Sequence, residues 1–215
     1  MNLRLLQLAD SAFPSGAYAF SDGLETLTQR GEVRSADDLT LFLRGQLRGG
    51  WGTQDAPACA LAWQADTHIK QLQELDALLD DLKLVEGPRK ASGRIGANLR
   101  KAALKLWPDE LAHLPETRHQ ATTFGAVARR LGASLEDTVT AYLSAWLLGR
   151  VTSATRLMKL GGLDAQHCAA RCETDARWCV DFAMRATPDD LGGFTPLLDI
   201  AAAEQAELPE RLFQT

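Results

Sequence analysis

The chain has 215 residues, of which 46% are hydrophobic and 24% charged, and its formal net charge is −5. This length is enough for one domain with a sizeable core. The acidic balance disfavours binding to nucleic acid through its phosphates. No segment has the form of a secretory signal or approaches the about 18 apolar residues of a membrane span. We therefore expect a cytoplasmic protein that binds neither nucleic acid nor membrane.

The first predicted element is a turn followed by a helix, over residues 9–31. Pro14 fixes its own φ and keeps the preceding residue out of the helical region, and Gly16 can adopt a positive φ. A tight turn that directs Tyr18 and Phe20 inward is expected here. Helical spacing starts at about Phe20, and Gly31 stands where a C′ glycine ends a helix.

Apolar residues at helical spacing predict further helices along the rest of the chain, and no stretch shows sustained period-two alternation. Ser35 and Ser134 each precede an aspartate by three residues, as in a capping box. Asp55 is expected to start a helix with Pro57 near its first turn. The glycine-rich segment 49–53 lacks the spacing of a P-loop and is predicted to link two helices.

The broadest apolar face belongs to a predicted helix from about residue 135 to 151, which is expected to be central in the core. Gly125 and Gly149 are expected to allow close approach between helices. The sequence therefore predicts an all-α fold. We expect a single-domain bundle of about nine or ten helices over residues 1–215, with terminal segments that become ordered on a partner.

Three of the four cysteines, Cys168, Cys172 and Cys179, are spaced to share one face of a predicted helix from Asp164 to Ala186. A structural zinc site usually has a Cys-x-x-Cys knuckle and ligands from two segments, which are lacking here. We expect buried thiols and no metal ligands. The alternative is a nickel- or zinc-binding protein that uses His167, Cys168 and Cys172.

No pattern of catalytic or cofactor-binding residues stands out. The chain has four histidines, and none has the setting of a hydrolase triad; His119 is expected to cap or pack a helix. No EF-hand, HExxH or dinucleotide fingerprint is present. The sequence predicts no catalytic residue and no cofactor. A helical enzyme with a site around Tyr18 and Asp22 is a further alternative, but no nucleophile–base pair supports it.

The chain ends in a predicted interaction tail, residues 195–215. An acidic, broken helix is followed by Arg211, Leu212 and Phe213. Apolar residues this close to a terminus are expected to occupy a groove, either on this protein or on a partner.

Eight positions near the N-terminus carry a resemblance to one family: Asp10, Ser11, Pro14, Gly16, Ser21, Gly23, Leu24 and Glu25. They resemble the opening signature Asp-Ser-x-x-Pro-x-Gly-x-x-x-x-Ser-x-Gly-Leu-Glu of the urease accessory protein F (UreF) family. Residues 92–99, 124–126, 141–143, 151–157 and 211–213 are similar to later blocks of the same family. The sequence departs from the family pattern at Lys159, Gly162, Ala165, Gln205 and Ala206.

The resemblance implies a non-enzymatic assembly factor for urease that forms a homodimer. Members of the family bind the D-type accessory protein (H-type in some systems) and, through it, apo-urease, and recruit the G-type GTPase for GTP-dependent nickel insertion. The residues expected at the D/H-type interface are Ser11, Pro14, Gly16, Tyr18, Ser21, Glu25, Asp199, Ile200, Arg211, Leu212 and Phe213. Those expected near the GTPase are Arg94, Tyr142, Arg156 and Gly161. An alternative that the sequence leaves open is that this protein activates the GTPase, with Arg94 or Arg156 as an arginine finger.

Overall fold

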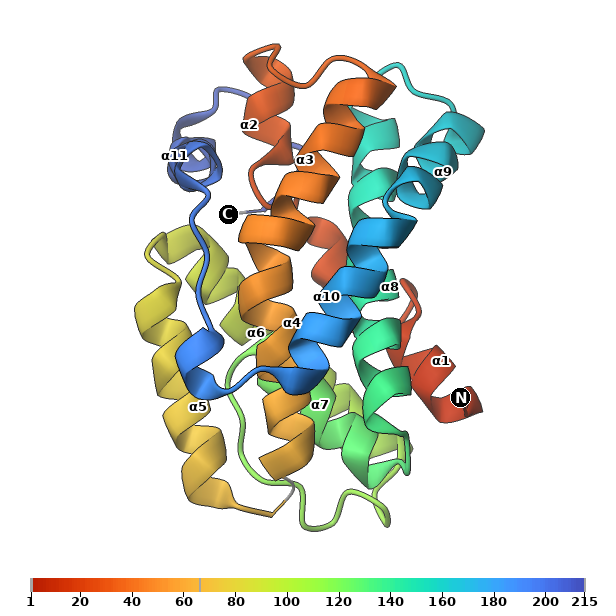
Figure 1. Cartoon of the computed structure of the whole chain (residues 1–215), viewed down its shortest axis with the longest axis vertical. Helices are drawn as coiled ribbons and strands as arrows, with labels where there is room; N and C mark the ends of the chain where they lie inside the picture. Colours follow the sequence, from red (N-terminus) through yellow and green to blue (C-terminus); the bar gives the residue numbers. More distant parts are fainter. Residues whose placement is uncertain (1, 66, 215) are drawn as a thin grey trace.

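The computed structural model describes residues 2–65 and 67–214, which form eleven α-helices and no strand (Figure 1). The all-α prediction is therefore confirmed. The helices are α1 (Leu3–Ala9), α2 (Leu24–Gln29), α3 (Ala36–Gly49), α4 (Trp51–Ala65), α5 (Ile69–Leu82), α6 (Glu86–Leu106), α7 (Gln120–Arg130), α8 (Leu135–Leu157), α9 (Gly162–Arg171), α10 (Glu173–Arg185) and α11 (Pro196–Glu204). Three short 3-10 turns are η1 (Ala17–Ala19), η2 (Pro188–Asp190) and η3 (Gln205–Glu207). No helix in the described ranges is long and apolar enough to cross a bilayer.

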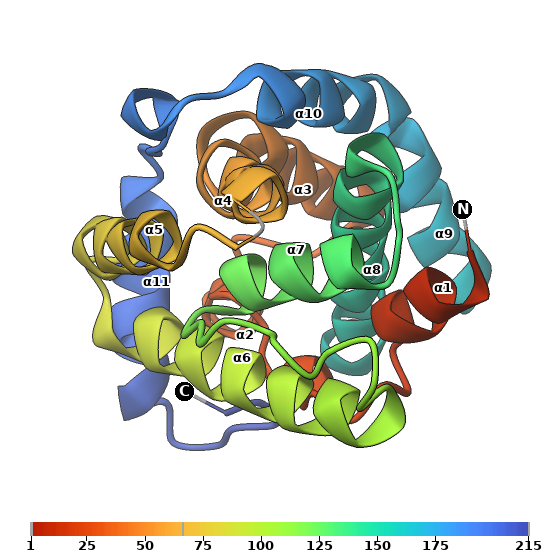
Figure 2. The same cartoon turned by 90° about the horizontal axis from the view of Figure 1, so that it is seen from below.

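Helix α4 is the centre of the bundle. It packs against α3, α5, α7, α8 and α10 (Figure 2). Its buried positions include Ala56, Ala58, Ala60 and Ala62, and such short side chains let neighbouring helices approach closely. Helix α8, whose broad apolar face predicted a central core helix, is also a core helix: it packs against α4, α7, α9 and α10 and contributes buried side chains to both large apolar clusters.

The predicted start of α4 is wrong. The helix begins at Trp51, so Asp55 and Pro57 lie inside it rather than at its first turn. Proline has no N–H to donate to the carbonyl four residues earlier. That carbonyl, on Thr53, instead accepts the N–H of Gly192 at 3.1 Å. A distant loop therefore satisfies the group that the proline leaves unpaired.

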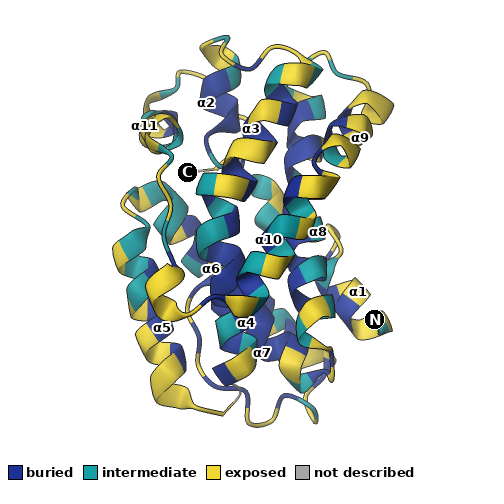
Figure 3. Ribbon diagram, in the orientation of Figure 1, coloured by how far each residue is buried: buried dark blue, intermediate teal, exposed yellow. Residues whose placement is uncertain are grey.

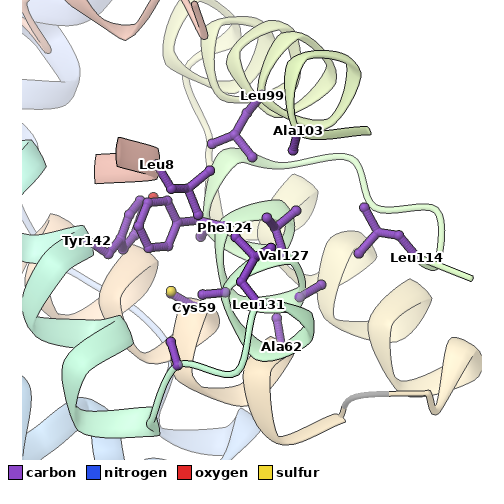
Figure 4. Close-up of a cluster of buried hydrophobic side chains, with 14 of the residues drawn as sticks. Leu8, Cys59, Ala62, Leu99, Ala103, Leu114, Phe124, Val127, Leu131 and Tyr142 are labelled. Carbon is purple, nitrogen blue, oxygen red and sulfur yellow. The ribbon is translucent and has the colours of Figure 1, made fainter. Parts of the chain in front are cut away.

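Two buried apolar clusters make up most of the core (Figure 3). One joins α1 and α4–α7 to α8, and within it Phe124 of α7 packs against Tyr142 of α8 (Figure 4). The other joins α2 and α3 to α8–α11 and contains Cys168, Cys172 and Cys179. These thiols are buried as predicted, although they lie on two helices, because the chain breaks at Cys172 between α9 and α10.

The two glycines expected at close helix contacts behave differently. A Cβ atom on Gly125 would lie 2.2 Å from the carbonyl oxygen of Cys59, so the approach of α7 to α4 requires a glycine there. A Cβ on Gly149 would meet nothing within 4 Å. The prediction is confirmed for Gly125 and wrong for Gly149.

The N-terminal turn has the predicted backbone but not both predicted side-chain directions. Gly16 has a φ of +81°, and Gly31 ends α2 with a φ of +71°. Phe20 is buried as expected, whereas Tyr18 is 65% exposed. Because the short 3-10 turn η1 spans residues 17–19, the ring of Phe20 is directed into the protein and that of Tyr18 towards solvent. The sequence did not show this difference.

Candidate functional site

The C-terminal segment packs on an early part of the chain at one junction, which we define as residues 15–30 together with 195–214. Helix α11 packs against α2, and the segment after it runs back over the N-terminal motif (Figure 1). The backbone N–H of Gln214 donates to the carbonyl of Ala19 at 2.7 Å. The side chain of Gln29 donates to the carbonyl of Glu210 at 2.9 Å. The last residues are thus fastened by specific hydrogen bonds to residues that come early in the sequence.

The carboxylate of Glu25 is the centre of the junction. It is fully buried and accepts the backbone N–H groups of Leu212, at 2.6 Å, and Phe213, at 3.2 Å. It also accepts the side-chain amide of Gln205 at 3.2 Å. A buried carboxylate is costly unless such donors surround it. Glu25 therefore fixes the path of the tail as well as the position of α2.

Two arginines flank the tail. The guanidinium carbon of Arg156 lies 4.8 Å from the ring centroid of Phe213, and that of Arg94 lies 4.9 Å from the ring centroid of Phe20. Arg94 also contacts the side chain of Gln214. Both are in the range of cation–π attraction, so these arginines hold the junction together while remaining exposed themselves.

The residues expected at a D/H-type interface divide into two groups. Ser21, Glu25 and Phe213 are buried, and Gly16 is half-buried, so in this conformation they shape the junction from within. The others are exposed and are the ones a partner can reach: Ser11, Pro14, Tyr18, Asp199, Ile200, Arg211 and Leu212. The sequence did not distinguish these two roles.

The four residues expected near a GTPase are not all brought together. Arg94 and Arg156 both touch the junction. Tyr142 is only 1% exposed and lies in the core, so its expected place at the surface is corrected. Gly161 is exposed and lies at the N-cap of α9, outside the junction.

A cavity of about 240 Å³ lies beneath the junction. Asp22 faces it with φ at +53° and forms an ion pair with the buried Arg150, at 2.6 Å. The indole N–H of Trp146 donates to the same carboxylate at 3.1 Å. Burial, reinforced by Asp55, raises the pKa of Tyr142 well above its usual value. In the alternative enzyme site, which is built around Tyr18 and Asp22, the Asp22 carboxylate is engaged by these two donors, and Tyr18 lines the cavity with an exposed side chain.

The alternative metal site is not assembled. His167 is exposed, whereas Cys168 and Cys172 are buried. The Cys168 thiol contacts the carbonyl of Ala36 at 3.3 Å, and burial raises the pKa of Cys172 to about 11. The part of the chain that the structure describes contains no group of three or more His, Cys, Asp or Glu residues suited to a metal.

Two structural roles were missed from the sequence. Gln205, noted only as a departure from the family pattern, bridges Ser21 and Glu25. Asp55 forms a buried ion pair with Lys83 at 2.6 Å instead of capping a helix. Each partner is more than 25 residues away in the sequence, so no local pattern could have indicated the pairing.

Together, the fold and the junction define an all-helical protein whose C-terminal tail and N-terminal motif present exposed side chains around a buried carboxylate. A family model described as UreF matches residues 33–173. A urease accessory protein UreF from Mesorhizobium japonicum is 33% identical, over 99% of this chain and 96% of the relative. Proteins of the same name from Arthrobacter sp. and Geobacillus kaustophilus are each 30% identical over 99% of this chain, with 96% and 97% of their own lengths covered. The chain belongs to the UreF family of urease accessory proteins.

Proposed function

We propose that this chain is a cytoplasmic, non-enzymatic assembly factor for urease. It binds the D/H-type accessory protein and, with it, apo-urease, and it recruits the G-type GTPase for GTP-dependent nickel insertion. It does so as a homodimer. Membership of a family of urease accessory proteins supports this function.

The proposal depends on one observation: large apolar side chains are exposed at a junction whose backbone is held in place by hydrogen bonds. Leu212 follows the tail past Glu25 with 61% of its side chain exposed, and Tyr18 is 65% exposed on the adjoining turn. Ile200, on α11, is 49% exposed. Large apolar and aromatic side chains held in fixed positions are typical anchors of protein interfaces. The D/H-type protein is the proposed occupant of this surface.

The proposed GTPase contact uses the exposed arginines at the edge of the same junction. Arg94 and Arg156 are exposed and charged at any physiological pH, and their guanidinium groups lie over the rings of Phe20 and Phe213. A partner seated on the tail would therefore be close to both. In the proposed assembly, the D/H-type protein binds first and completes the surface that the GTPase meets.

The test is co-purification of the full chain with a D/H-type and a G-type accessory protein, followed by size exclusion. We expect one complex from the native chain. The variant Leu212→Ala is expected to weaken D/H-type binding about tenfold, since a truncated interface anchor costs roughly 1–2 kcal/mol. Leu163→Ala is the matched control, because Leu163 is 72% exposed on α9.

Two outcomes contradict the proposal. If the native chain elutes alone while the D/H-type protein is folded and soluble, the assembly role is wrong. If Leu212→Ala and Leu163→Ala bind equally well, the complex uses another surface. The homodimer is tested separately by sedimentation equilibrium of the isolated chain.

A further inference from the structure

A second surface lies away from Glu25, in a groove between the N-terminal turn and the C-terminal half of α6. Figure 2 shows α1 beside the end of α6, where Arg4 and Glu110 form an ion pair at 2.7 Å. The groove encloses about 710 Å³. The residues that characterise it are Asp10, Phe13, Pro14, Lys101, Lys105 and Leu106.

The floor of the groove is apolar and firmly supported. Phe13 is buried and its ring stacks on that of Trp107, with 6.2 Å between centroids and 10° between planes. Leu106 leaves 48% of its side chain exposed at one edge, and Pro14 is exposed at the other. Because Phe13 and Trp107 fix the floor, the exposed apolar groups are held in place before any partner arrives.

The rim of the groove is positively charged. Lys101 and Lys105 are exposed one helical turn apart on α6. Neither ammonium group has an ion-pair partner among the residues that the structure describes. The one carboxylate on the opposite wall, Asp10, accepts the backbone N–H of Ala12 at 2.7 Å. The rim therefore carries a net positive charge on a chain whose total charge is −5.

We propose that this groove binds an acidic segment of another protein that also carries apolar side chains. Carboxylates of the segment pair with Lys101 and Lys105, and its apolar side chains cover Leu106 and Pro14. Charge complementarity of this kind steers association and fixes the register of a bound segment. Nucleic acid is a poorer match, since two lysines neutralise few phosphates and the rest of the molecule is acidic.

The experiment uses the purified full chain and a library of twelve-residue peptides in which acidic, basic, apolar and polar residues are equally frequent. Peptides retained by the native chain are compared with those retained by the double variant Lys101→Glu/Lys105→Glu. The matched control is Lys70→Glu/Lys159→Glu, which changes the net charge equally at two other exposed lysines. We expect the native chain and the control to enrich peptides with acidic and apolar residues. The groove variant should lose at least about tenfold in affinity for them.

Each other outcome overturns the proposal. Equal enrichment by the native chain and the groove variant means that the groove is not the binding surface, and no enrichment of acidic, apolar peptides means that it takes no such segment. A change in oligomeric state of the groove variant by sedimentation equilibrium identifies a second copy as the occupant. Retention of single-stranded DNA that depends on Lys101 and Lys105 identifies nucleic acid instead. The peptide experiment uses the isolated chain. Its result therefore does not depend on whether the chain forms a complex with other urease accessory proteins.

Discussion

The helical body around α4 and the junction of residues 15–30 with 195–214 are stabilised by different interactions. The body consists of closely packed apolar side chains, and the contact of α7 with α4 leaves no room for a single Cβ at Gly125. The junction depends on hydrogen bonds to Glu25 and on two arginines stacked over aromatic rings. Interactions of the second kind involve few residues and can open locally while a packed core stays intact. The surface offered to partners is thus separable from the fold that carries it.

The largest effect is expected in the body, from Gly125→Ala. The added methyl would lie 2.2 Å from the carbonyl oxygen of Cys59, so α7 must move away from α4. Overpacking of this kind should lower the free energy of unfolding by about 3 kcal/mol. Urea denaturation measures the change. Gly149→Ala is the matched control on α8, where the methyl meets nothing and better helix propensity should stabilise the chain by up to about 1 kcal/mol.

Equal stability of these two variants would show that α4 and α7 are not packed as described. The body would then accept an added methyl group as easily as the protein surface does, and would not differ from the junction in this respect.

The second prediction concerns the centre of the junction, Glu25→Ala. The variant removes the acceptor for the N–H groups of Leu212 and Phe213 and for the Gln205 amide. Hydrogen bonds to a charged group contribute about 1.5–3 kcal/mol each. Amide hydrogen exchange at Leu212 and Phe213 should therefore accelerate about 100-fold as the tail detaches.

The same experiment contains its own control in the body. Cys59 is fully buried between α4 and α7, and burial raises the pKa of its thiol well above the usual value, so its labelling reports opening of the core. We expect its labelling rate to stay unchanged in Glu25→Ala. A parallel rise at Cys59 would mean that junction and body unfold as one unit.

A smaller effect at the junction is expected from Arg156→Gln. The exposed guanidinium lies over the ring of the buried Phe213, and a cation–π contact at an exposed site contributes about 0.5–1 kcal/mol. Amide exchange at Phe213 should accelerate only about three- to fivefold. An acceleration equal to that of Glu25→Ala would show that the aromatic stack, and not the carboxylate, holds the tail.

The sequence was sufficient for the features that depend on neighbouring residues. Ser35 forms the predicted capping box with Asp38, and Gly31 ends α2 with positive φ, because capping and helix termination are decided within one or two turns. Gly125 was also recognised as a close contact, since a glycine inside an apolar helix pattern has few other uses.

The sequence was insufficient where distant segments decide the outcome. Glu25 meets Leu212 and Phe213 across nearly the whole chain, and no periodicity relates them. The helical break at Cys172 and the interior position of Pro57 have the same origin, since tertiary contacts such as that of Gly192 with Thr53 override local propensity. The residues proposed to face a partner come from the resemblance, but their division into buried and exposed side chains required the structure.

A similarly small effect is expected in the body at alkaline pH, through Cys172. Burial raises the pKa of this thiol from 9.0 to about 11, so between pH 9 and pH 11 the unfolded chain loses the proton while the folded chain keeps it. Stability must then fall as the pH rises through this window, by about 1 kcal/mol at pH 10. Urea denaturation at pH 8 and pH 10 measures the loss. Cys172→Ala should lose less stability between these two values than the native chain. An equal loss in both proteins would mean that the thiol reaches solvent, and that the core formed by α3, α9 and α10 opens as readily as the junction.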